Sequence, residues 1–398
     1  RSDAVGTWAM GQPAAPTASA RAASRGELCL ASERAPASRV CAAGAWRAPT
    51  GWRATATIDQ LPLALVDSLL PDSSMWKGRG LDGMLQARLD ANAMGNQLTG
   101  TLHAEADGAG IAYREPTDTV ARRVAFDTAA VDIRAGADGV HGTLRLSASH
   151  PDSAGIGTLV VTGALPQYTR FGLPLARQPF QAEVKGGIPD LALLRPFTSA
   201  DSLGGALTID LTGSGLIGTP HVDGGAQLAN FNIWLPGGRA GRGNVDLTVT
   251  SAVAESRAIT ADVRVIPRGV IYDYTLDLLP QRVVVDSGGL RVQAGADGLH
   301  AAFGLRLADS TGARRLMSFA TQLDLPQYTS LSQTLRREPM TFGLSANIPD
   351  LGVTRVVTPG IDTLSGSLTV SASAHGTIAT PELTGALSLA DRDADLIQ

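Results

Sequence analysis

The sequence of 398 residues lacks a long uninterrupted apolar run. A membrane-spanning helix needs at least about 18 such residues in a row. The most apolar stretch, LPLALVDSLL at residues 61–70, is interrupted by Asp67. No positively charged segment followed by an apolar one opens the chain, so we expect no signal peptide and no transmembrane helix within it.

Aromatic residues and lysine are also scarce. Phe, Trp and Tyr together make up 5% of the residues, and the only lysines are Lys77 and Lys185. A core built on large rings is therefore not expected, and the interior should be aliphatic. The net charge of −4 shows no excess of basic residues. This balance argues against nucleic acid as a partner, because nucleic-acid binders carry a basic stripe.

Motifs that carry chemistry are absent or out of context. GSGLIG at 213–218 fits the dinucleotide-binding pattern, but Pro220 and a further strand pattern follow it where a helix is required. The six histidines show no zinc spacing, and the sequence has no nucleophile motif. We therefore predict a protein that is not an enzyme, with no catalytic residues, no cofactor and no metal site.

The two cysteines, Cys29 and Cys41, are 12 positions apart, with the turn-like stretch SERAPAS between them. A hairpin would place them on facing strands, where an oxidising compartment would join them in a disulfide. Closing such a loop stabilises a fold by about 3 kcal/mol. The alternative is a pair of buried free thiols in a cytosolic protein.

Internal repeats organise the chain. LPQYT occurs at 165–169 and again at 325–329, and each copy is preceded by an AGADG stretch and followed by an IPDL stretch. A weaker copy lies upstream. We divide the chain into a partial, divergent first unit with the cysteine hairpin (1–115), a second unit (116–275) and a truncated third unit (276–398), all in one continuous rod.

The units are patterned as strands. Stretches such as GALTIDLTG and NVDLTVTSAV alternate aliphatic with polar residues, which is typical of strands with one apolar face. Gly, Asp and Pro clusters separate the stretches, as in an antiparallel meander. The residues expected to line the apolar face are Leu207, Ile209, Leu211, Val245, Leu247, Val249, Leu368 and Val370.

Helical patterns are short and cannot cover this face. In 61–71 and 188–197 an apolar stripe runs for two or three turns and ends at proline or phenylalanine. An uncovered apolar face normally marks a binding surface, unless the sheet curls on itself. We therefore predict an all-β fold: an elongated, curled antiparallel sheet of tandem repeats with a few short helices and an open groove.

The first 115 residues resemble the translocation and assembly module TamB family (AsmA-like, bridge-like lipid transfer proteins). The resemblance lies in LCL at 28–30, VC at 40–41, GAWR and GWRA at 44–54, and LPLALVDSLLP. Later stretches such as GSGLIGTPHVDGGAQL are similar to the repeats of that family. The resemblance implies a periplasmic β-taco with an apolar interior, an inner-membrane anchor, and a C-terminal region that meets an outer-membrane barrel assembly protein.

Two functions follow from these patterns. The resemblance implies a periplasmic conduit that carries phospholipid acyl chains between the inner and outer membranes and supports outer-membrane protein assembly and secretion. The alternative is a structural or adhesive β-repeat rod that holds no ligand. A polysaccharide-cleaving β-solenoid would show clustered carboxylates and aromatics along one face, and the sequence shows neither.

Overall fold

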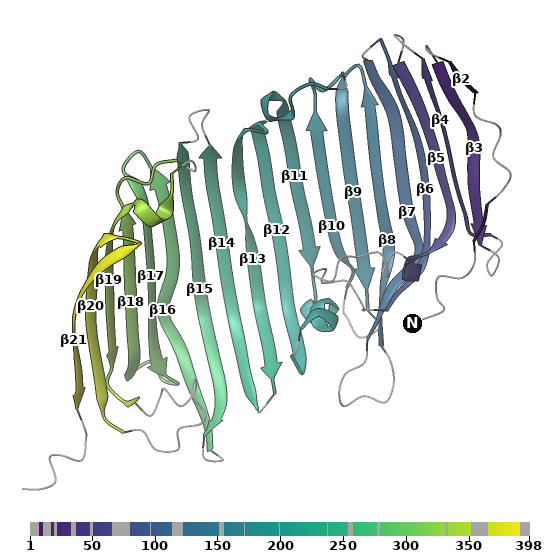
Figure 1. Cartoon of the computed structure of the whole chain (residues 1–398). Coiled ribbons are helices and arrows are strands. Elements are labelled where there is room, and N and C mark those ends of the chain that lie inside the picture. Colours follow the sequence, from purple (N-terminus) through teal and green to yellow (C-terminus); the bar gives the residue numbers. More distant parts are fainter. Residues whose placement is uncertain are drawn as a thin grey trace, which may run out of the picture. The chain divides into compact units, whose positions relative to one another are not determined.

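The structure is a computed structural model of the whole chain (Figure 1). It describes residues 8–10, 17–19, 22–32, 37–47, 51–65, 80–95, 97–113, 122–150, 155–170, 172–198, 200–236, 238–253, 258–276, 279–330, 333–351 and 365–390. Packing divides the chain into unit 1, residues 1–196 with 212–218, and unit 2, residues 197–211 with 219–398. The limits of these two units differ from those of the three repeat units predicted at 1–115, 116–275 and 276–398. The division into three repeat units stays a prediction from the sequence.

The predicted all-β class is confirmed, since the described residues are almost entirely antiparallel strands. Unit 1 holds β1 (Trp8–Met10), β2 (Thr17–Ser19), β3 (Ala22–Ser32), β4 (Arg39–Arg47), β5 (Gly51–Pro62), β6 (Leu81–Met94), β7 (Gln97–Tyr113), β8 (Arg122–Gly136), β9 (Gly139–Ser149), β10 (Gly157–Leu165) and β11 (Pro179–Ile188). From β3 to β11, each strand pairs with the next one along the chain.

Unit 2 repeats this meander. It holds β13 (Thr219–Leu235), β14 (Arg239–Val253), β15 (Ile259–Leu276), β16 (Leu279–Gly295), β17 (Gly298–Asp309), β18 (Arg315–Leu325), β19 (Pro339–Ile348), β20 (Ser367–Thr377) and β21 (Thr380–Ala390). Neighbouring strands are again antiparallel. β12 (Ser202–Leu216) contributes residues 202–211 to unit 2 and its remainder to unit 1.

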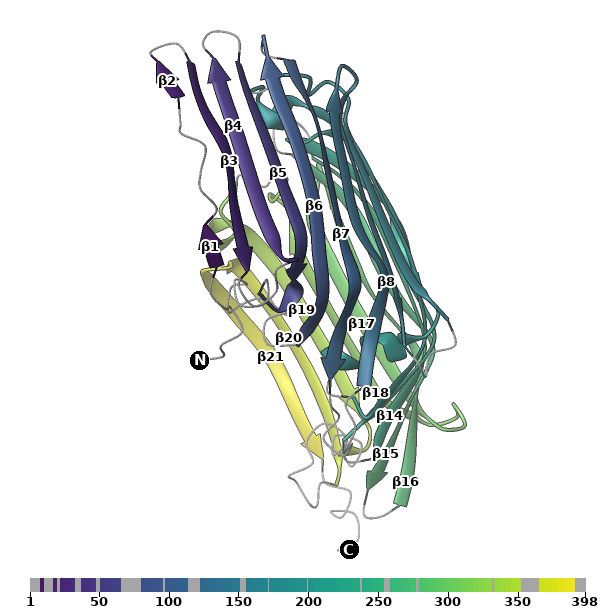
Figure 2. The same cartoon turned by 90° about the vertical axis from the view of Figure 1, so that its right-hand side faces the viewer.

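The strands of unit 1 are bent rather than flat. β-bulges interrupt the ladder between Ile58 and Leu61, between Asp82 and Met84, and between Phe126 and Thr128. A bulge bends its strand and increases the local twist. Figure 2 shows the resulting bend in β6 and β7. The predicted curling of the sheet follows from these bulges.

Helical structure is confined to short pieces, as predicted, and three of the pieces that the structure describes are 3₁₀ helices, which are tighter than an α-helix. The IPDL stretch of the second repeat forms the 3₁₀ helix η3 (Leu191–Phe197). Two further 3₁₀ turns, η2 (Leu175–Arg177) and η4 (Leu335–Arg337), precede β11 and β19. The pattern at 61–71 begins a helical turn at 63–65, and its continuation at 66–71 lies outside the described residues.

Each copy of LPQYT ends a strand and starts a segment that runs along the strand ends. We call residues 166–170 and 172–178 strap 1, and residues 326–330 and 333–338 strap 2. Strap 1 passes the tip of the β8–β9 hairpin, because the Leu98 N–H on β7 donates to the Thr169 carbonyl at 2.9 Å. It then returns to β12, where the Ile217 N–H donates to the Gln178 carbonyl at 3.0 Å.

Strap 2 repeats this course in unit 2. The Ile259 N–H on β15 donates to the Thr329 carbonyl at 3.0 Å, and the Ile378 N–H donates to the Glu338 carbonyl at 3.3 Å. The straps therefore satisfy backbone groups that the hairpin tips leave unpaired at one rim of each sheet. The leucine of each LPQYT copy is the last residue of a strand, and Leu325 is only 2% exposed.

The core of the described residues lies at the strand ends and not at the middle of the sheet. Ile111 and Val124 face each other where β7 ends and β8 begins, and they are 0% and 2% exposed. At the start of β10, a Cβ added to Gly157 would lie 2.8 Å from Leu193 of η3. Straps and 3₁₀ helices thus cover the rims, while the middle of each apolar face is only partly covered.

Candidate functional site

An uninterrupted aliphatic row crosses the strands of unit 1. Strand register places its members directly opposite one another on successive strands, so all of them lie on one face of the sheet. Each is partly exposed. We call this surface the apolar face of unit 1; its central row is Val40, Ile58, Ala87, Ala104, Val131, Leu144, Val161 and Val184.

Unit 2 carries an equivalent surface, which we call the apolar face of unit 2. A second row lies beside its central row and includes Leu290 and Phe303, which are 36% and 37% exposed. Most members of its central row are partly exposed, although Ala374 is 1% exposed and Leu383 is 74% exposed. The central row is Val249, Val263, Val292, Ala301, Leu323, Phe342, Ala374 and Leu383.

The residues predicted to line the face lie on the same side of the sheet as these rows. Val249 belongs to the central row of unit 2, Leu247 pairs with Val265 in the second row, and Val245 pairs with Pro267. On β20, Val370 lies opposite Ala346 and Leu368 lies opposite Ile348.

The three predicted residues on β12 follow the same alternation. Leu207, Ile209 and Leu211 are partly covered, whereas Thr208 and Asp210 between them are exposed. The strand pattern of the sequence was therefore sufficient to choose the side chains of the apolar face.

Ion pairs occupy the opposite face. Asp132 on β8 accepts from Arg145 on β9 at 2.8 Å and lies 2.6 Å from His103 on β7. This contact raises the pKa of His103 and lowers that of Asp132, chiefly through the hydrogen bond between them. Cross-strand pairs of opposite charge stabilise a sheet. Their polar side chains make this face of the sheet hydrophilic.

Unit 2 has a similar group around His300. Its Nδ1 lies 2.7 Å from Asp324 on the neighbouring strand and its Nε2 lies 3.4 Å from Asp297. The hydrogen bond to Asp324 is the main cause of the raised pKa of His300. The local sequence around His300 does not show this contact, because the partner Asp324 is remote in the chain and is brought close by the β17–β18 register.

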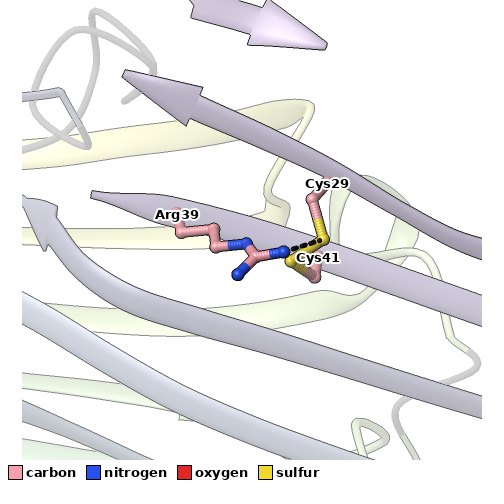
Figure 3. Close-up of a disulfide and its surroundings, with 3 residues drawn as sticks. All are labelled: Cys29, Arg39 and Cys41. Atoms are coloured by element: carbon pink, nitrogen blue, oxygen red, sulfur yellow. Dashed lines mark hydrogen bonds between the residues drawn. A yellow bond between two sulfur atoms is a disulfide. The ribbon is translucent and has the colours of Figure 1, made fainter. Parts of the chain in front are cut away.

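The predicted disulfide is present. Cys29 on β3 and Cys41 on β4 are directly opposite, their Cα atoms are 4.0 Å apart, and their sulfur atoms are bonded. Figure 3 shows Arg39 donating to the Cys29 sulfur at 3.2 Å. Glu27 lies within reach of both sulfur atoms. Since thiolates are needed to ligate a metal, the bonded cysteines of this group cannot serve as ligands.

Two tryptophans lie at one end of the apolar face of unit 1. Trp46 is directly opposite Trp52, at the end of β4 and the start of β5, and Trp46 is 46% exposed. Nearly half of the surface of Trp46 is therefore open to solvent. Trp76 lies outside the described residues.

Comparison with known proteins identifies no relative: no protein family, curated protein or solved structure matches this chain. Among the described residues, no helix has the length and apolar character needed to cross a bilayer.

Proposed function

We propose that this chain is a non-enzymatic segment of a lipid conduit, whose apolar faces carry phospholipid acyl chains between the inner and outer membranes. The observation that supports the proposal is the row of apolar side chains, most of them partly exposed, on successive strands of each unit, from Val40 to Val184 and from Val249 to Leu383. Such a surface is costly to leave in water, and an acyl chain lying on it would remove that cost.

The chemistry of the rows suits movement better than tight binding. Each buried methylene contributes about 0.8 kcal/mol, and aliphatic side chains offer the same contact at every strand. No polar group interrupts the central rows, so no position would hold a lipid much more strongly than the next. A uniform surface of this kind lets an acyl chain slide in small steps.

Compartment and partners are part of the same proposal. The Cys29–Cys41 disulfide supports an oxidising compartment, as the periplasm is. The resemblance to the TamB family supports an inner-membrane anchor and contact with an outer-membrane barrel assembly protein, both through regions other than those described here. The associated role in outer-membrane protein assembly rests on that resemblance alone.

The test changes the apolar face of unit 2 and compares it with the opposite face. The variant Leu207→Asp/Ile209→Asp/Leu211→Asp places three charges among partly covered positions. The matched control, Thr208→Asp/Thr212→Asp/Thr248→Asp, places three charges at exposed positions that alternate with the apolar ones. Lipid that copurifies with each protein, or crosslinks to it, is extracted and quantified by mass spectrometry.

We expect the apolar-face variant to lose most of its bound lipid and the control to keep the wild-type amount. Circular dichroism of both variants checks that the strands persist. If the wild type and both variants carry equal amounts of bound lipid, the proposal is contradicted for this segment. If the wild-type protein carries no lipid, the alternative of a structural or adhesive rod is favoured.

A further inference from the structure

The two straps carry exposed arginines at equivalent positions. η2 of strap 1 consists of Leu175, Ala176 and Arg177, and η4 of strap 2 consists of Leu335, Arg336 and Arg337. Leu175 is 52% exposed and Leu335 is 47% exposed. All three arginines are exposed as well, whereas the next residue in each strap is buried. Both straps therefore present an aliphatic side chain and a guanidinium side by side at the rim.

Backbone hydrogen bonds fix these groups to the rim. The Ala176 carbonyl accepts from the Gly218 N–H at 2.8 Å, and the Arg336 carbonyl accepts from the Ala379 N–H at 3.0 Å. Because the carbonyl two residues further along each strap, of Gln178 and of Glu338, is bonded to the same hairpin tip, the turn cannot swing away without breaking two bonds. The same geometry occurs in both copies of the repeat, 160 residues apart in the chain.

These arginines differ from those on the face opposite the aliphatic rows. There, Arg264 and Arg291 bind Asp262, and Arg282 binds Asp273. Arg177, Arg336 and Arg337 form no ion pair with any residue that the structure describes. Strap 1 has no acidic residue in its sequence, and the single acid of strap 2, Glu338, is 8% exposed. The strap guanidiniums are thus available to an external anion.

A lipid on the apolar face brings an anion to the same place. Its acyl chains can leave water, but its phosphate cannot do so without a large penalty. The headgroup must therefore stay where the apolar face meets solvent, which is the rim along which the straps run. Guanidinium groups bind phosphate through two parallel charge-assisted hydrogen bonds.

We propose that Arg177 of strap 1 and Arg336 and Arg337 of strap 2 bind the phosphate of a lipid headgroup, while Leu175 and Leu335 contact the start of its acyl chains. This inference rests on the proposed function and adds to it a preference for lipids with an anionic phosphate. Each unit thus has one headgroup site in its strap, beside its own apolar face, where the acyl chains are held without preference.

The test compares two lipids that differ only in the headgroup. Phosphatidylglycerol and diacylglycerol with the same acyl chains are offered in detergent micelles to the full chain, and binding is measured by fluorescence of a labelled acyl chain. The variant is Arg177→Gln/Arg337→Gln, with one change in each strap. The matched control is Arg88→Gln/Arg306→Gln, which removes two exposed positive charges outside the straps.

We expect the strap variant to bind phosphatidylglycerol about fivefold more weakly than the wild type, because it loses partly exposed charge-assisted contacts with the phosphate. Its affinity for diacylglycerol should equal that of the wild type. The control should match the wild type for both lipids. Arg177→Lys/Arg337→Lys keeps the charge but loses the paired hydrogen bonds, so it should give an intermediate result. If the glutamine variant does not fold, the comparison of the lysine variant with the wild type decides.

Three results would overturn the inference. If the strap variant binds both lipids equally more weakly, the arginines have a structural role. If it binds both lipids as tightly as the wild type, the arginines take no part in lipid binding. Competition by free glycerophosphate as strong as by the intact lipid would assign the site to soluble phosphate. Failure of the wild-type chain to bind either lipid is a different result, because it overturns the proposed function itself.

Discussion

The N–H of Leu98 donates to the carbonyl of Thr169 at 2.9 Å, although Leu98 lies on β7, Thr169 follows β10, and β8 and β9 lie between these two strands. The strap that carries Thr169 bridges this distance by passing the tip of the β8–β9 hairpin. The close approach depends on Gly139 at that tip, which has a φ of +95°.

Replacing Gly139 by alanine should destabilise unit 1. A Cβ at this position would lie 2.1 Å from the Leu165 carbonyl oxygen, and the positive φ disfavours any L side chain. We expect a loss of at least about 2 kcal/mol in the free energy of unfolding, measured by urea denaturation. Gly163→Ala is the control, because nothing lies within 4 Å of its added Cβ. Equal midpoints for the two variants would contradict this account of the strap.

Removing the disulfide should weaken the β3–β4 hairpin. The bond closes a loop between positions 12 residues apart, which corresponds to about 3 kcal/mol of stabilisation. The variant Cys29→Ser/Cys41→Ser should therefore show faster hydrogen exchange at the backbone amides of β3 and β4. Amides of β17 and β18, in the other unit, serve as the internal reference. Unchanged exchange at β3 and β4 would show that the strand pairing holds the hairpin without the bond.

The His103–Asp132 contact should depend on pH in a defined window. The raised pKa of His103 means that its stabilisation is fully present below its unfolded pKa, near 6.5, and is lost as the pH rises through the folded value. The lowered pKa of Asp132 means that its stabilisation is present above its unfolded pKa, near 3.8, and is lost as the pH falls through the folded value. The contact is therefore strongest between the two folded pKa values.

An NMR titration of the histidine ring protons tests this contact. In Asp132→Asn, the pKa of His103 should fall, because the hydrogen bond to Asp132 is the largest cause of its increase. The pKa of His300, which depends mainly on Asp324, should stay as in the wild type. A His103 pKa that does not respond to the substitution would show that the pair does not form in solution.

The exposed leucines of β21 should promote self-association. Leu383, Leu387 and Leu389 are 74%, 69% and 66% exposed, and β20 is the only strand paired with β21 among the described residues. A long apolar edge strand of this kind is a template for pairing with another chain. We expect Leu387→Lys/Leu389→Lys to lower the apparent mass of the protein in light scattering at high concentration. Ser388→Lys, on the opposite face of the same strand, should have a smaller effect.

Much of the local structure could be predicted from the sequence. The alternation around Leu207, Ile209 and Leu211 was enough to choose the apolar side of β12, because side chains alternate between faces in any strand. The Asp138–Gly139 pair predicted the turn between β8 and β9, since glycine adopts positive φ without strain. The spacing of Cys29 and Cys41 predicted their opposition, because a short hairpin has few possible registers.

Local patterns could not show which remote groups would meet. Asp132 binds both His103 and Arg145, and the three residues lie on three neighbouring strands, where only the strand register brings them together. Nothing near Asp132 in the sequence records that register. The sequence likewise marked LPQYT as a repeated element, but the pairing of Thr169 with Leu98 follows from the relative lengths of four strands.

By itself, the sequence determined the strands, the side of each strand that is aliphatic, the turns and the repeat. These properties depend on residues within about ten positions of one another, where backbone geometry leaves few choices. Only the tertiary structure decided that the rims are covered while the aliphatic rows stay partly open, and that Arg177 and Arg337 stand at a covered rim. These properties depend on the register and the length of every strand in a sheet. Because a single bulge shifts the register of the strands that follow it, one bulge is enough to change them.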